Sequence, residues 1–349
     1  MAGGIGSRFW PFSRNNHPKQ FHDILGTGQT MIQQTVARFE GICPMENIYI
    51  VTNKIYKDKV KAQLPLLSDD QILLEPVARN TAPCVAYASY KIYQKNPEAN
   101  IVVAPSDHVI MKEEEFRRCI EMSLSETERN PLIVTLGIKP HRPDTGYGYI
   151  QFLGKSYGEL HKVKTFTEKP NLELALQFIE SGDFVWNAGI FVFNARTIID
   201  SFEAHLVEMA DLFNQGNEVY YTPEEAKFID STYSLCKGIS IDYGIMEKAK
   251  NVHVLLCDFG WSDLGTWKSL YDISDKDENG NVLKGNHLLY ESRNCIVRTP
   301  NERLVIMEGV EDLIVAEHEN VLMICKKDSE QRVKEFLGDA KEFYGEDFV

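Results

Sequence analysis

The sequence predicts an α/β fold built on a mainly parallel sheet, followed by a small β-rich domain. Short β-branched runs alternate with longer amphipathic helical patterns over roughly residues 1 to 270, as is typical of strand–helix–strand units. A polar, turn-rich segment, DISDKDENGN at 272–281, follows, and after it come short apolar pieces without long helices between them. These observations predict a first domain at 1–271 and a second at 282–349.

The elements of the first domain are expected in the order strand, helix, strand, helix. Strands are expected at 47–52, 101–104, 132–138 and 190–194, and helices at 30–40, 81–94, 113–129 and 172–181. The helix at 81–94 shows the reasoning. Asn80 or Thr81 can cap it, and Pro83 fits its first turn. Val85 and Ile92 then share one apolar face.

The second domain is expected to consist of stacked strands or coils. The pieces NHLLYES, NCIVRTP, RLVIMEG, DLIVAEH and NVLMICK recur at intervals of roughly ten residues, which favours a small β domain. A final helix is expected from Ser329.

The composition is that of an ordinary folded protein, with 43% hydrophobic and 25% charged residues. The formal net charge of -14 repels nucleic acids and anionic membranes, so we expect neither as a partner. No apolar run is long enough to span a bilayer, and no signal-peptide pattern begins the chain. The seven scattered cysteines form no C-x-x-C pair. They predict free thiols and a cytoplasmic location.

The first candidate site is the stretch AGGIGSR at 2–8. Glycines let backbone N–H groups approach a phosphate closely, and Arg8 and Lys19 add positive charge. The stretch does not match the Rossmann motif, because Phe9 stands where the last glycine should be, and it does not match the Walker A motif. Taken alone, it is equally well interpreted as an ordinary glycine turn followed by surface charges.

Two carboxylates follow predicted strand ends. Asp107 comes after the apolar run at 101–104, and Asp263 comes after VHVLLCDF. Ligands of open α/β sheets collect at the carboxyl ends of strands. The two side chains could therefore complete one Mg²⁺ site together with substrate phosphates. The structural alternatives are a cap or turn residue for Asp107 and a helix cap for Asp263.

Four further stretches mix amide, carboxylate or ammonium groups with Gly or Pro, as expected where a protein approaches a hydroxyl-rich ligand. They are EPVARNTAP at 75–83, TGYGYI at 145–150, TEKP at 167–170 and WNAGIF at 186–191. Singly, each would be interpreted as a loop.

In combination, the motifs resemble those of the sugar-1-phosphate nucleotidylyltransferases, and most closely the mannose-1-phosphate guanylyltransferases, or GDP-mannose pyrophosphorylases. In the order of the family they are AGGIGSRFWPFSR with PKQF, EPVARNTAP, PSDH, GYGYI, FTEKP, WNAGIFVF, DYGIMEK and GWSDLGTW. WPFSR and PKQF favour the mannose and guanine branch. The resemblance covers nearly the whole chain. It implies a Rossmann-like nucleotidyltransferase domain with a mixed, mainly parallel sheet, and then a small left-handed β-helix-like domain.

The reaction implied by the resemblance transfers GMP from GTP to mannose 1-phosphate and gives GDP-mannose and pyrophosphate with Mg²⁺. The sugar phosphate attacks the α-phosphorus in line, so the protein aligns two polyanions and needs no nucleophile of its own. By resemblance, Arg8 and Lys19 grip the phosphates and Asp107 and Asp263 hold the metal, and these four are the expected catalytic residues.

The resemblance also implies the binding residues. Those expected at the nucleotide are Ala2, Gly3, Gly4, Gly6, Ser7, Arg8, Glu75, Asn80, Thr81, Ser106 and Asp107. Those expected at the sugar phosphate are Gly146, Glu168, Lys169, Asn187 and Gly189, with Lys169 at the phosphate itself. A homodimer is expected from the same resemblance.

One departure and two alternatives accompany this interpretation. In the family an apolar strand precedes the glycine loop, so the first strand is expected to be missing upstream of residue 1, with lower stability and activity as a result. One alternative is an enzyme of the same class that uses another nucleotide or another sugar phosphate, such as a heptose or glucose 1-phosphate. The other is a catalytically silent regulatory protein that binds nucleotide sugars. The joint presence of Arg8, Lys19, Asp107 and Asp263 speaks against the silent protein.

Overall fold

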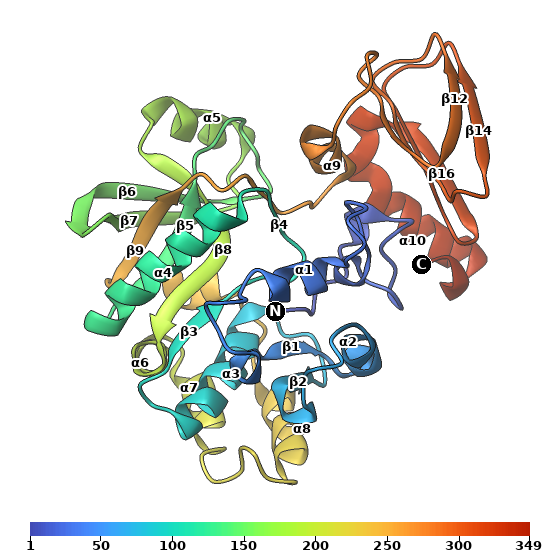
Figure 1. Ribbon diagram of the computed structural model, residues 1–349. Helices are drawn as coiled ribbons and strands as arrows, with labels where there is room; N and C mark the ends of the chain where they lie inside the picture. The colour runs from blue at the N-terminus through green and yellow to red at the C-terminus, as the bar shows by residue number, and fades with distance from the viewer. The chain divides into compact units, whose positions relative to one another are not determined.

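The computed structural model describes residues 1–349, and the chain folds into two compact units (Figure 1). Unit 1 comprises Met1–Gly3, Val36–Ser106 and Ile110–Trp261, and unit 2 comprises Gly4–Thr35, Asp107–Val109 and Ser262–Val349. Three elements lie where the chain passes from one unit to the other: α1 (Met31–Ala37), β4 (Val109–Ile110) and β10 (Trp261–Ser262).

Unit 1 is built on a mixed six-stranded sheet with the strand order β3-β8-β5-β9-β7-β6. Strands β5 and β9 pair in parallel, with Ile133 opposite Val252. The other five pairings of this sheet are antiparallel. The strands are β3 (Asn100–Val103), β5 (Ile133–Ile138), β6 (Gly148–Tyr157), β7 (Leu160–Glu168), β8 (Phe184–Asn194) and β9 (Val252–Cys257).

The α/β class and the mixed sheet are confirmed, but the expectation of a mainly parallel sheet is wrong. Only Gly158 and Glu159 separate β6 from β7, and so short a connection permits antiparallel pairing alone. Strand β8 also runs antiparallel to β3, β5 and β6. The expectation rested on strands separated by helices and did not include the β6–β7 hairpin.

Helices cover both faces of this sheet. Successive strand residues point to opposite faces, so Ile133 enters the core formed with α3, α6 and α7, while Val134 enters the core formed with α4 and α5. In Figure 1, α4 lies along one face of the sheet. The bounds are α3 (Thr81–Lys95), α4 (Glu113–Arg129), α5 (Leu172–Ser181), α6 (Ala195–His205) and α7 (Val207–Asn214).

A second, two-stranded sheet in unit 1 pairs β1 (Ile50–Asn53) with β2 (Ile72–Glu75) in parallel. Helices α2 (Lys57–Gln63) and α8 (Glu225–Leu235) pack beside it. The first residues of the chain lie along β1, because the backbone N of Ala2 donates to the carbonyl O of Val51 at 2.8 Å. The hydroxyl of Thr52 donates to the carbonyl O of Ala2 at 2.8 Å.

The C-terminal strands of unit 2 stack as coils. In these pairings Ile314 lies on Ile296 and Leu304 lies on Asn286, eighteen residues apart in both cases. The expected β-helix-like architecture is confirmed, and the handedness of the coil stays a prediction. The parallel strands are β11 (Val282–Lys284), β12 (Asn286–Tyr290), β13 (Ile296–Arg298), β14 (Leu304–Glu308) and β15 (Leu313–His318), and the antiparallel β16 (Val321–Lys326) and α10 (Val333–Tyr344) follow.

The N-terminal segment of unit 2 shares a core with these coils. Phe9 stacks on Trp267 of α9 (Trp267–Ile273), with ring centroids 4.5 Å apart and planes inclined by 10°. Both rings are fully buried, and Ile296 and Ile314 belong to the same cluster. The domain boundary expected at 272–281 stays a prediction.

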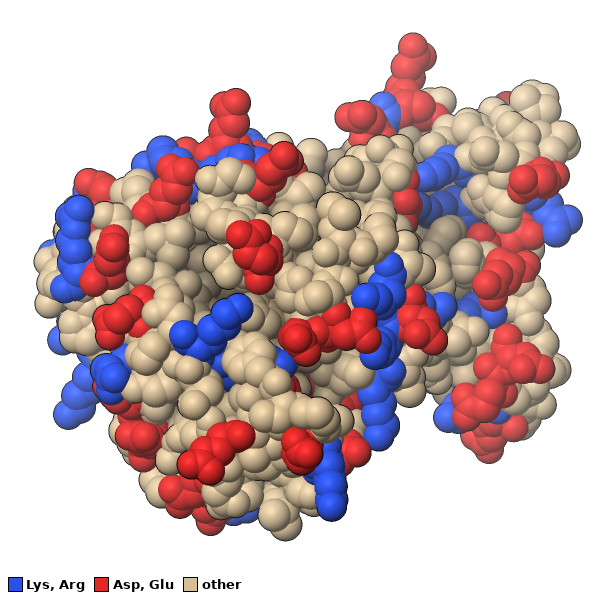
Figure 2. Space-filling view, turned by 60° about the horizontal axis from the view of Figure 1, so that its bottom comes forward, with Lys and Arg blue, Asp and Glu red and all other residues tan.

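The surface carries charges of both signs. Figure 2 shows acidic and basic side chains interspersed over the face in view. The seven cysteines are all free thiols, five of them buried. None of the helices combines the length and the apolar character needed to cross a membrane.

Candidate active site

In unit 2 the glycine loop is shaped around Lys19. Gly6 has a φ of 73°, and a Cβ at this position would lie 3.0 Å from the Cβ of Lys19, so the backbone conformation and the close approach both favour glycine. The backbone N of Lys19 donates to Oγ of Ser13 at 3.1 Å, and the Ser13 hydroxyl donates to the carbonyl O of Ile5. These contacts hold the loop against the segment that carries Lys19.

Lys19 connects two of the predicted carboxylate residues. Its Nζ lies 2.9 Å from Oδ2 of Asp107. It also donates to the carbonyl oxygens of Asp263 at 2.8 Å and Leu264 at 3.1 Å. An ammonium group has three N–H donors, and here each has an acceptor. The structure therefore brings Lys19, Asp107 and Asp263 together, around a lysine side chain that is 3% exposed.

The two carboxylates have different local roles. Burial by itself raises the pKa of Asp107, but the Lys19 ammonium and His108 outweigh it, so the pKa lies below the usual value and the group is ionised at neutral pH. Oδ1 of Asp263 accepts from the backbone N of Gly265 at 2.9 Å, within a turn. The cap of α9 is Thr266 and not Asp263. Carboxylate oxygens are the ligands that Mg²⁺ prefers, so the chemistry of each of the two side chains suits a magnesium ligand.

Arg8 and Ser7 lie in the short helix η1 (Ser7–Phe9), directly after the glycine loop. Arg8 is partly buried and has no ion-pair partner in the chain. Its guanidinium is therefore available to an anionic ligand such as a phosphate.

The first group of predicted nucleotide-binding residues in unit 1 surrounds Glu75, at the end of β2. The hydroxyl of Tyr233 donates to its Oε1 at 3.0 Å, and a Cβ on Gly3 would lie 3.3 Å from its Oε2. Glu75 is 6% exposed. Burial raises the pKa of Glu75 to about 7, against a smaller opposite effect of Tyr233. Strongly shifted carboxyl groups of this kind cluster at functional sites.

Asn80 and Thr81 begin helix α3, as the sequence predicts. Asn80 has a φ of 68°, and its side chain accepts from the backbone N of Thr81 at 2.9 Å. The Thr81 hydroxyl accepts from the backbone N of Ile241 at 2.9 Å. Ser106 differs from both, since its hydroxyl is buried and has no hydrogen-bond partner in the protein. A buried unpaired hydroxyl is suited to a ligand or a water molecule.

The predicted sugar-phosphate residues meet at Asn187 of β8. Its Oδ1 accepts from the Thr135 hydroxyl and from the backbone N of Gly189, both at 3.0 Å. Its Nδ2 donates to Oδ1 of Asp242 at 2.9 Å. Gly189 has a φ of 67°, a conformation that favours glycine.

Glu168 and Lys169 form an ion pair beside Asn187. A Cβ on Gly148 would lie 2.5 Å from Oε2 of Glu168 and 3.5 Å from Cβ of Asn187, so both side chains border this glycine. Gly146 lies in the loop before β6, where its backbone N donates to Oδ1 of Asp144 at 2.9 Å. The structure thus brings Glu168, Lys169, Asn187 and Gly189 together.

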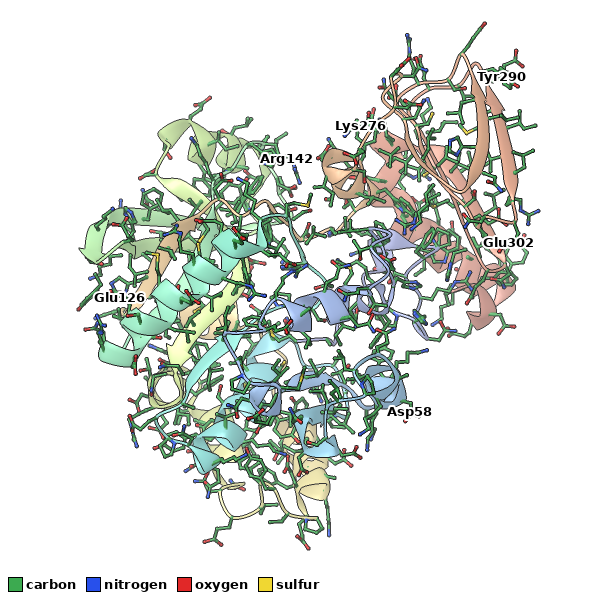
Figure 3. All side chains as sticks on the ribbon, viewed as in Figure 1. Asp58, Glu126, Arg142, Lys276, Tyr290 and Glu302 are labelled. Carbon is green, nitrogen blue, oxygen red and sulfur yellow. The ribbon has the colours of Figure 1, made fainter.

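The loop before β6 also carries Arg142, which is labelled in Figure 3. Its guanidinium pairs with Asp144 at 3.0 Å. It lies 5.4 Å from the ring centroid of Trp186 and 5.9 Å from that of Tyr147. The sequence analysis did not single out Arg142, because an arginine in a polar loop is ordinarily a solvated charge.

Thr135 and Asp242 form hydrogen bonds with Asn187, and the sequence analysis singled out neither residue. Thr135 lies inside the apolar run VTLGI and gives no signal, whereas Asp242 begins the quoted motif DYGIMEK. Asp242 also begins a π-helical turn, η6 (Asp242–Met246), and such turns are frequent at functional sites. Burial raises the pKa of Asp242 to about 6, and the charge of Glu168 adds to the effect.

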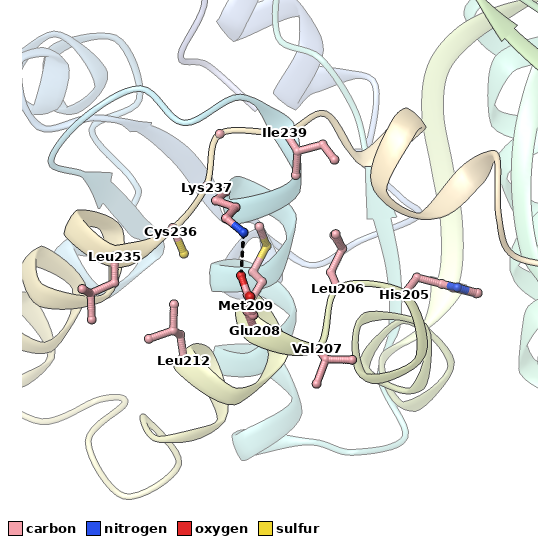
Figure 4. Close-up of a pocket in the computed structure, with 11 residues that line it drawn as sticks. His205, Leu206, Val207, Glu208, Met209, Leu212, Leu235, Cys236, Lys237 and Ile239 are labelled. Carbon is pink, nitrogen blue, oxygen red and sulfur yellow. Dashed lines mark hydrogen bonds and ion pairs between the residues drawn. The ribbon is translucent and has the colours of Figure 1, made fainter.

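A separate pocket of about 420 Å³ lies between the start of α7 and the segment after α8 (Figure 4). Its lining is mostly apolar, and an ion pair joins Glu208 and Lys237 at 2.9 Å. None of the predicted site residues lines it. Residues 236–239 line one side of this pocket, and the chain then continues to Ile241 and Asp242. Ile241 forms a hydrogen bond with Thr81, and Asp242 forms one with Asn187.

Comparisons with known proteins identify the family. The family model described as "Nucleotidyl transferase" matches residues 1–280, and the one described as "MannoseP isomerase/GMP-like beta-helix domain" matches 285–339. A mannose-1-phosphate guanylyltransferase of Salmonella montevideo is 38% identical over 350 residues, covering 98% of this chain and 73% of the relative. The chain belongs to the mannose-1-phosphate guanylyltransferase family. Its membership also confirms the expected class of enzyme, the nucleotidyltransferases.

One further relative and one solved structure are also similar to this chain over nearly its whole length. An alginate biosynthesis protein of Pseudomonas aeruginosa is 36% identical over 346 residues, covering 97% of this chain and 71% of that protein. A crystal structure from Thermus thermophilus, described as a mannose-1-phosphate geranyltransferase, superposes with a TM-score of 0.89 at 31% identity and covers 98% of both chains. The nucleotidyltransferase and β-helix parts of the guanylyltransferase fold are therefore both present.

Proposed function

We propose that the chain transfers GMP from GTP to mannose 1-phosphate, with GDP-mannose and pyrophosphate as products. The observation that carries this proposal is its similarity, at 33% to 38% identity over nearly the whole chain, to proteins named mannose-1-phosphate guanylyltransferase. The clustering of Lys19, Asp107 and Asp263 in unit 2 supports it, because phosphoryl transfer needs fixed positive charge and metal-binding oxygens at one place.

In the proposed reaction, an oxygen of the mannose 1-phosphate forms a bond to the α-phosphorus of GTP. The bond from that phosphorus to the bridging oxygen breaks, and pyrophosphate leaves with the electron pair. Arg8 and Lys19 neutralise the phosphates. Because every N–H of Lys19 has an acceptor, a phosphate oxygen has to replace one of them, and Asp107 is the only side chain among the three.

The proposed cofactor is Mg²⁺, held by Asp107 and Asp263. Bound there, the ion supplies charge neutralisation for the phosphates and the leaving pyrophosphate. Both residues belong to unit 2 and contact the same lysine, Asp107 through its carboxylate and Asp263 through its backbone carbonyl. The ionised state of Asp107 at neutral pH suits a metal ligand.

The other binding roles follow the residue groups described within each unit. We assign the nucleotide to Ala2, Gly3, Glu75, Asn80, Thr81 and Ser106 in unit 1, and to Gly4, Gly6, Ser7, Arg8 and Asp107 in unit 2. The Glu75 carboxylate offers acceptors, and the unpaired Ser106 hydroxyl offers a donor. We assign the mannose hydroxyls to Gly146, Glu168, Asn187 and Gly189, and the sugar phosphate to Lys169, whose side chain is 58% exposed.

A homodimer in the cytoplasm is also part of the proposal. Strands β12 and β14 expose Leu288, Tyr290, Leu304 and Ile306, and adjacent exposed apolar side chains are typical of an interaction surface. Seven free cysteines suit a reducing compartment. Sedimentation velocity of the purified chain tests the dimer, and a monomer at micromolar concentration would contradict it.

The experiment that tests the function is an assay of pyrophosphate release with Mg²⁺, in which GTP, ATP, UTP and dTTP are each combined with mannose 1-phosphate and glucose 1-phosphate. Turnover confined to GTP with mannose 1-phosphate is the expected result. Preference for another pair would assign the chain to a different nucleotidyltransferase. Binding of GDP-mannose without turnover of any pair would favour a silent regulatory protein.

A further inference from the structure

The side-chain amide of Asn187 has nearly all of its hydrogen-bonding capacity satisfied within the protein. An amide offers two lone pairs on its oxygen and two N–H groups on its nitrogen. Thr135 and Gly189 donate to Oδ1, and Asp242 accepts from Nδ2. One N–H group of Nδ2 is left for a ligand.

Asp242 and Gly189 fix the direction in which this amide faces. If the amide were turned over, Oδ1 would face the carboxylate of Asp242 and Nδ2 would face the backbone N–H of Gly189. Acceptor would then oppose acceptor, and donor would oppose donor. The Thr135 hydroxyl can donate or accept, so it permits either orientation. The carboxylate and the backbone amide therefore decide the orientation together.

We propose that Asp242 is a positioning residue of the sugar subsite. It orients the side-chain amide of Asn187 so that Nδ2 donates one hydrogen bond to a hydroxyl oxygen of the sugar phosphate. This inference rests on the proposed function, because it takes the sugar phosphate to bind at Asn187 and Glu168. The Glu168 carboxylate beside it accepts hydrogen bonds. A sugar hydroxyl, which accepts one hydrogen bond and donates another, matches one donor and one acceptor supplied by two side chains that border the same glycine, Gly148.

The charged groups around Asp242 give the arrangement a pH dependence. Glu168, at the end of β7, raises the pKa of Asp242, and Lys169 lowers it, with burial as the largest cause of the rise to about 6. Glu247, which follows η6, also faces the charge of Glu168. A protonated Asp242 can donate to the amide oxygen of Asn187, so at acidic pH it no longer opposes the turned-over orientation, and only the backbone N–H of Gly189 still does. The affinity for the sugar phosphate should then fall.

The test measures KM for mannose 1-phosphate and for GTP separately in four proteins. Asp242→Ala removes the acceptor, and we expect KM for mannose 1-phosphate to rise about tenfold, with kcat and KM for GTP within about twofold of wild type. Asp242→Asn keeps an acceptor oxygen and should restore KM to within about threefold of wild type. The matched control is Asp183→Ala, which loses hydrogen bonds to Gln151 and Ser181 at the edge of the same sheet and should leave both KM values unchanged.

The pH profile gives a second readout. The sugar phosphate itself takes up a proton near pH 6, so the comparison is between proteins and not between pH values. Between about pH 7.5 and pH 5.5, KM for mannose 1-phosphate should rise more steeply in wild type than in Asp242→Asn, which has no proton to gain at this position.

Several results would overturn the inference: equal rises in both KM values for Asp242→Ala, no rise at all, no rescue by Asp242→Asn, or parallel pH profiles. Failure of the proposed function is distinguishable, because it appears first as absent turnover in wild type. Calorimetric titration with mannose 1-phosphate alone then decides the inference separately. Tighter binding to wild type than to Asp242→Ala supports it, and equal or absent binding refutes it.

Discussion

The Nζ of Lys19 lies 2.9 Å from Oδ2 of Asp107, with the lysine side chain 3% exposed and the aspartate side chain 31% exposed. Each group compensates a charge that would be costly to leave unpaired in a partly buried position. The same two groups are assigned to the phosphates and the metal in the proposed reaction. Ion pairing therefore keeps both side chains charged and in place before substrates bind.

Replacement of Lys19 by methionine should lower kcat by a factor of about 10² to 10³, because it removes a preorganised charge at the phosphates. Pyrophosphate release and far-UV circular dichroism, measured together, separate lost catalysis from lost folding. The matched control is Lys112→Met, which breaks the exposed ion pair with Asp258 in unit 1. If both variants lose activity equally, Lys19 has no specific role.

Asp263→Asn should abolish most turnover while leaving the melting temperature within a few degrees of wild type. The asparagine Oδ1 can still accept from the backbone N of Gly265, so the turn is preserved, and only the charge at the proposed metal site is lost. Activity should be titrated with Mg²⁺ in both proteins. Wild-type activity at low Mg²⁺ in the variant would exclude Asp263 as a metal ligand.

Gly6→Ala should lower stability and activity more than Gly28→Ala. Both glycines have positive φ values, 73° and 85°, but a Cβ at Gly28 meets nothing within 4 Å, whereas at Gly6 it lies 3.0 Å from the Cβ of Lys19. The backbone strain of about 1–2 kcal/mol is common to both, and displacement of Lys19 is specific to Gly6. Denaturant unfolding and kcat provide the comparison. Equal activities of the two variants would show that the loop tolerates a side chain beside Lys19.

Glu75→Gln should change how stability depends on pH. The pKa of Glu75 is raised by burial from 4.5 to about 7, so the wild type loses stability as pH rises from below 4.5 through about 7, by about 3 kcal/mol in total. Glutamine does not titrate, and its Oε1 can still accept from Tyr233. The wild type should therefore lose unfolding free energy between about pH 5 and pH 8, whereas the variant should not, so the difference between variant and wild type should shift in favour of the variant as the pH rises. Parallel curves would contradict the raised pKa.

Much of the fold could be predicted from local patterns. The helix expected at 113–129 is α4 (Glu113–Arg129), and the helix expected after Asn80 is α3 (Thr81–Lys95). Caps and apolar spacing decide such helices within a few residues. The β6–β7 hairpin was missed because the second half of β6 is exposed and lacks an apolar run. Half-exposed strands of this kind are stabilised by their partners more than by their own sequence.

The residues of the candidate site were also predicted only in part. Lys19, Asp107 and Asp263 were singled out from motifs, and the structure brings them into contact. Thr135 lies inside an apolar run and Asp242 was quoted only as part of the motif DYGIMEK, so their hydrogen bonds to Asn187, 52 and 55 residues away in the chain, were not predicted. A hydrogen bond over such a separation depends on the sheet register and on η6, and neither can be deduced from local sequence.

In the C-terminal coils, paired residues such as Ile296 and Ile314 lie eighteen positions apart. If one eighteen-residue coil were duplicated or deleted, the parallel pairs with this spacing, β12–β14 and β13–β15, would keep their register, whereas an insertion of another length there would shift apolar side chains out of the core. Evolution can therefore lengthen or shorten this part of the molecule in whole-coil steps, and natural length differences between relatives here should occur as multiples of one coil.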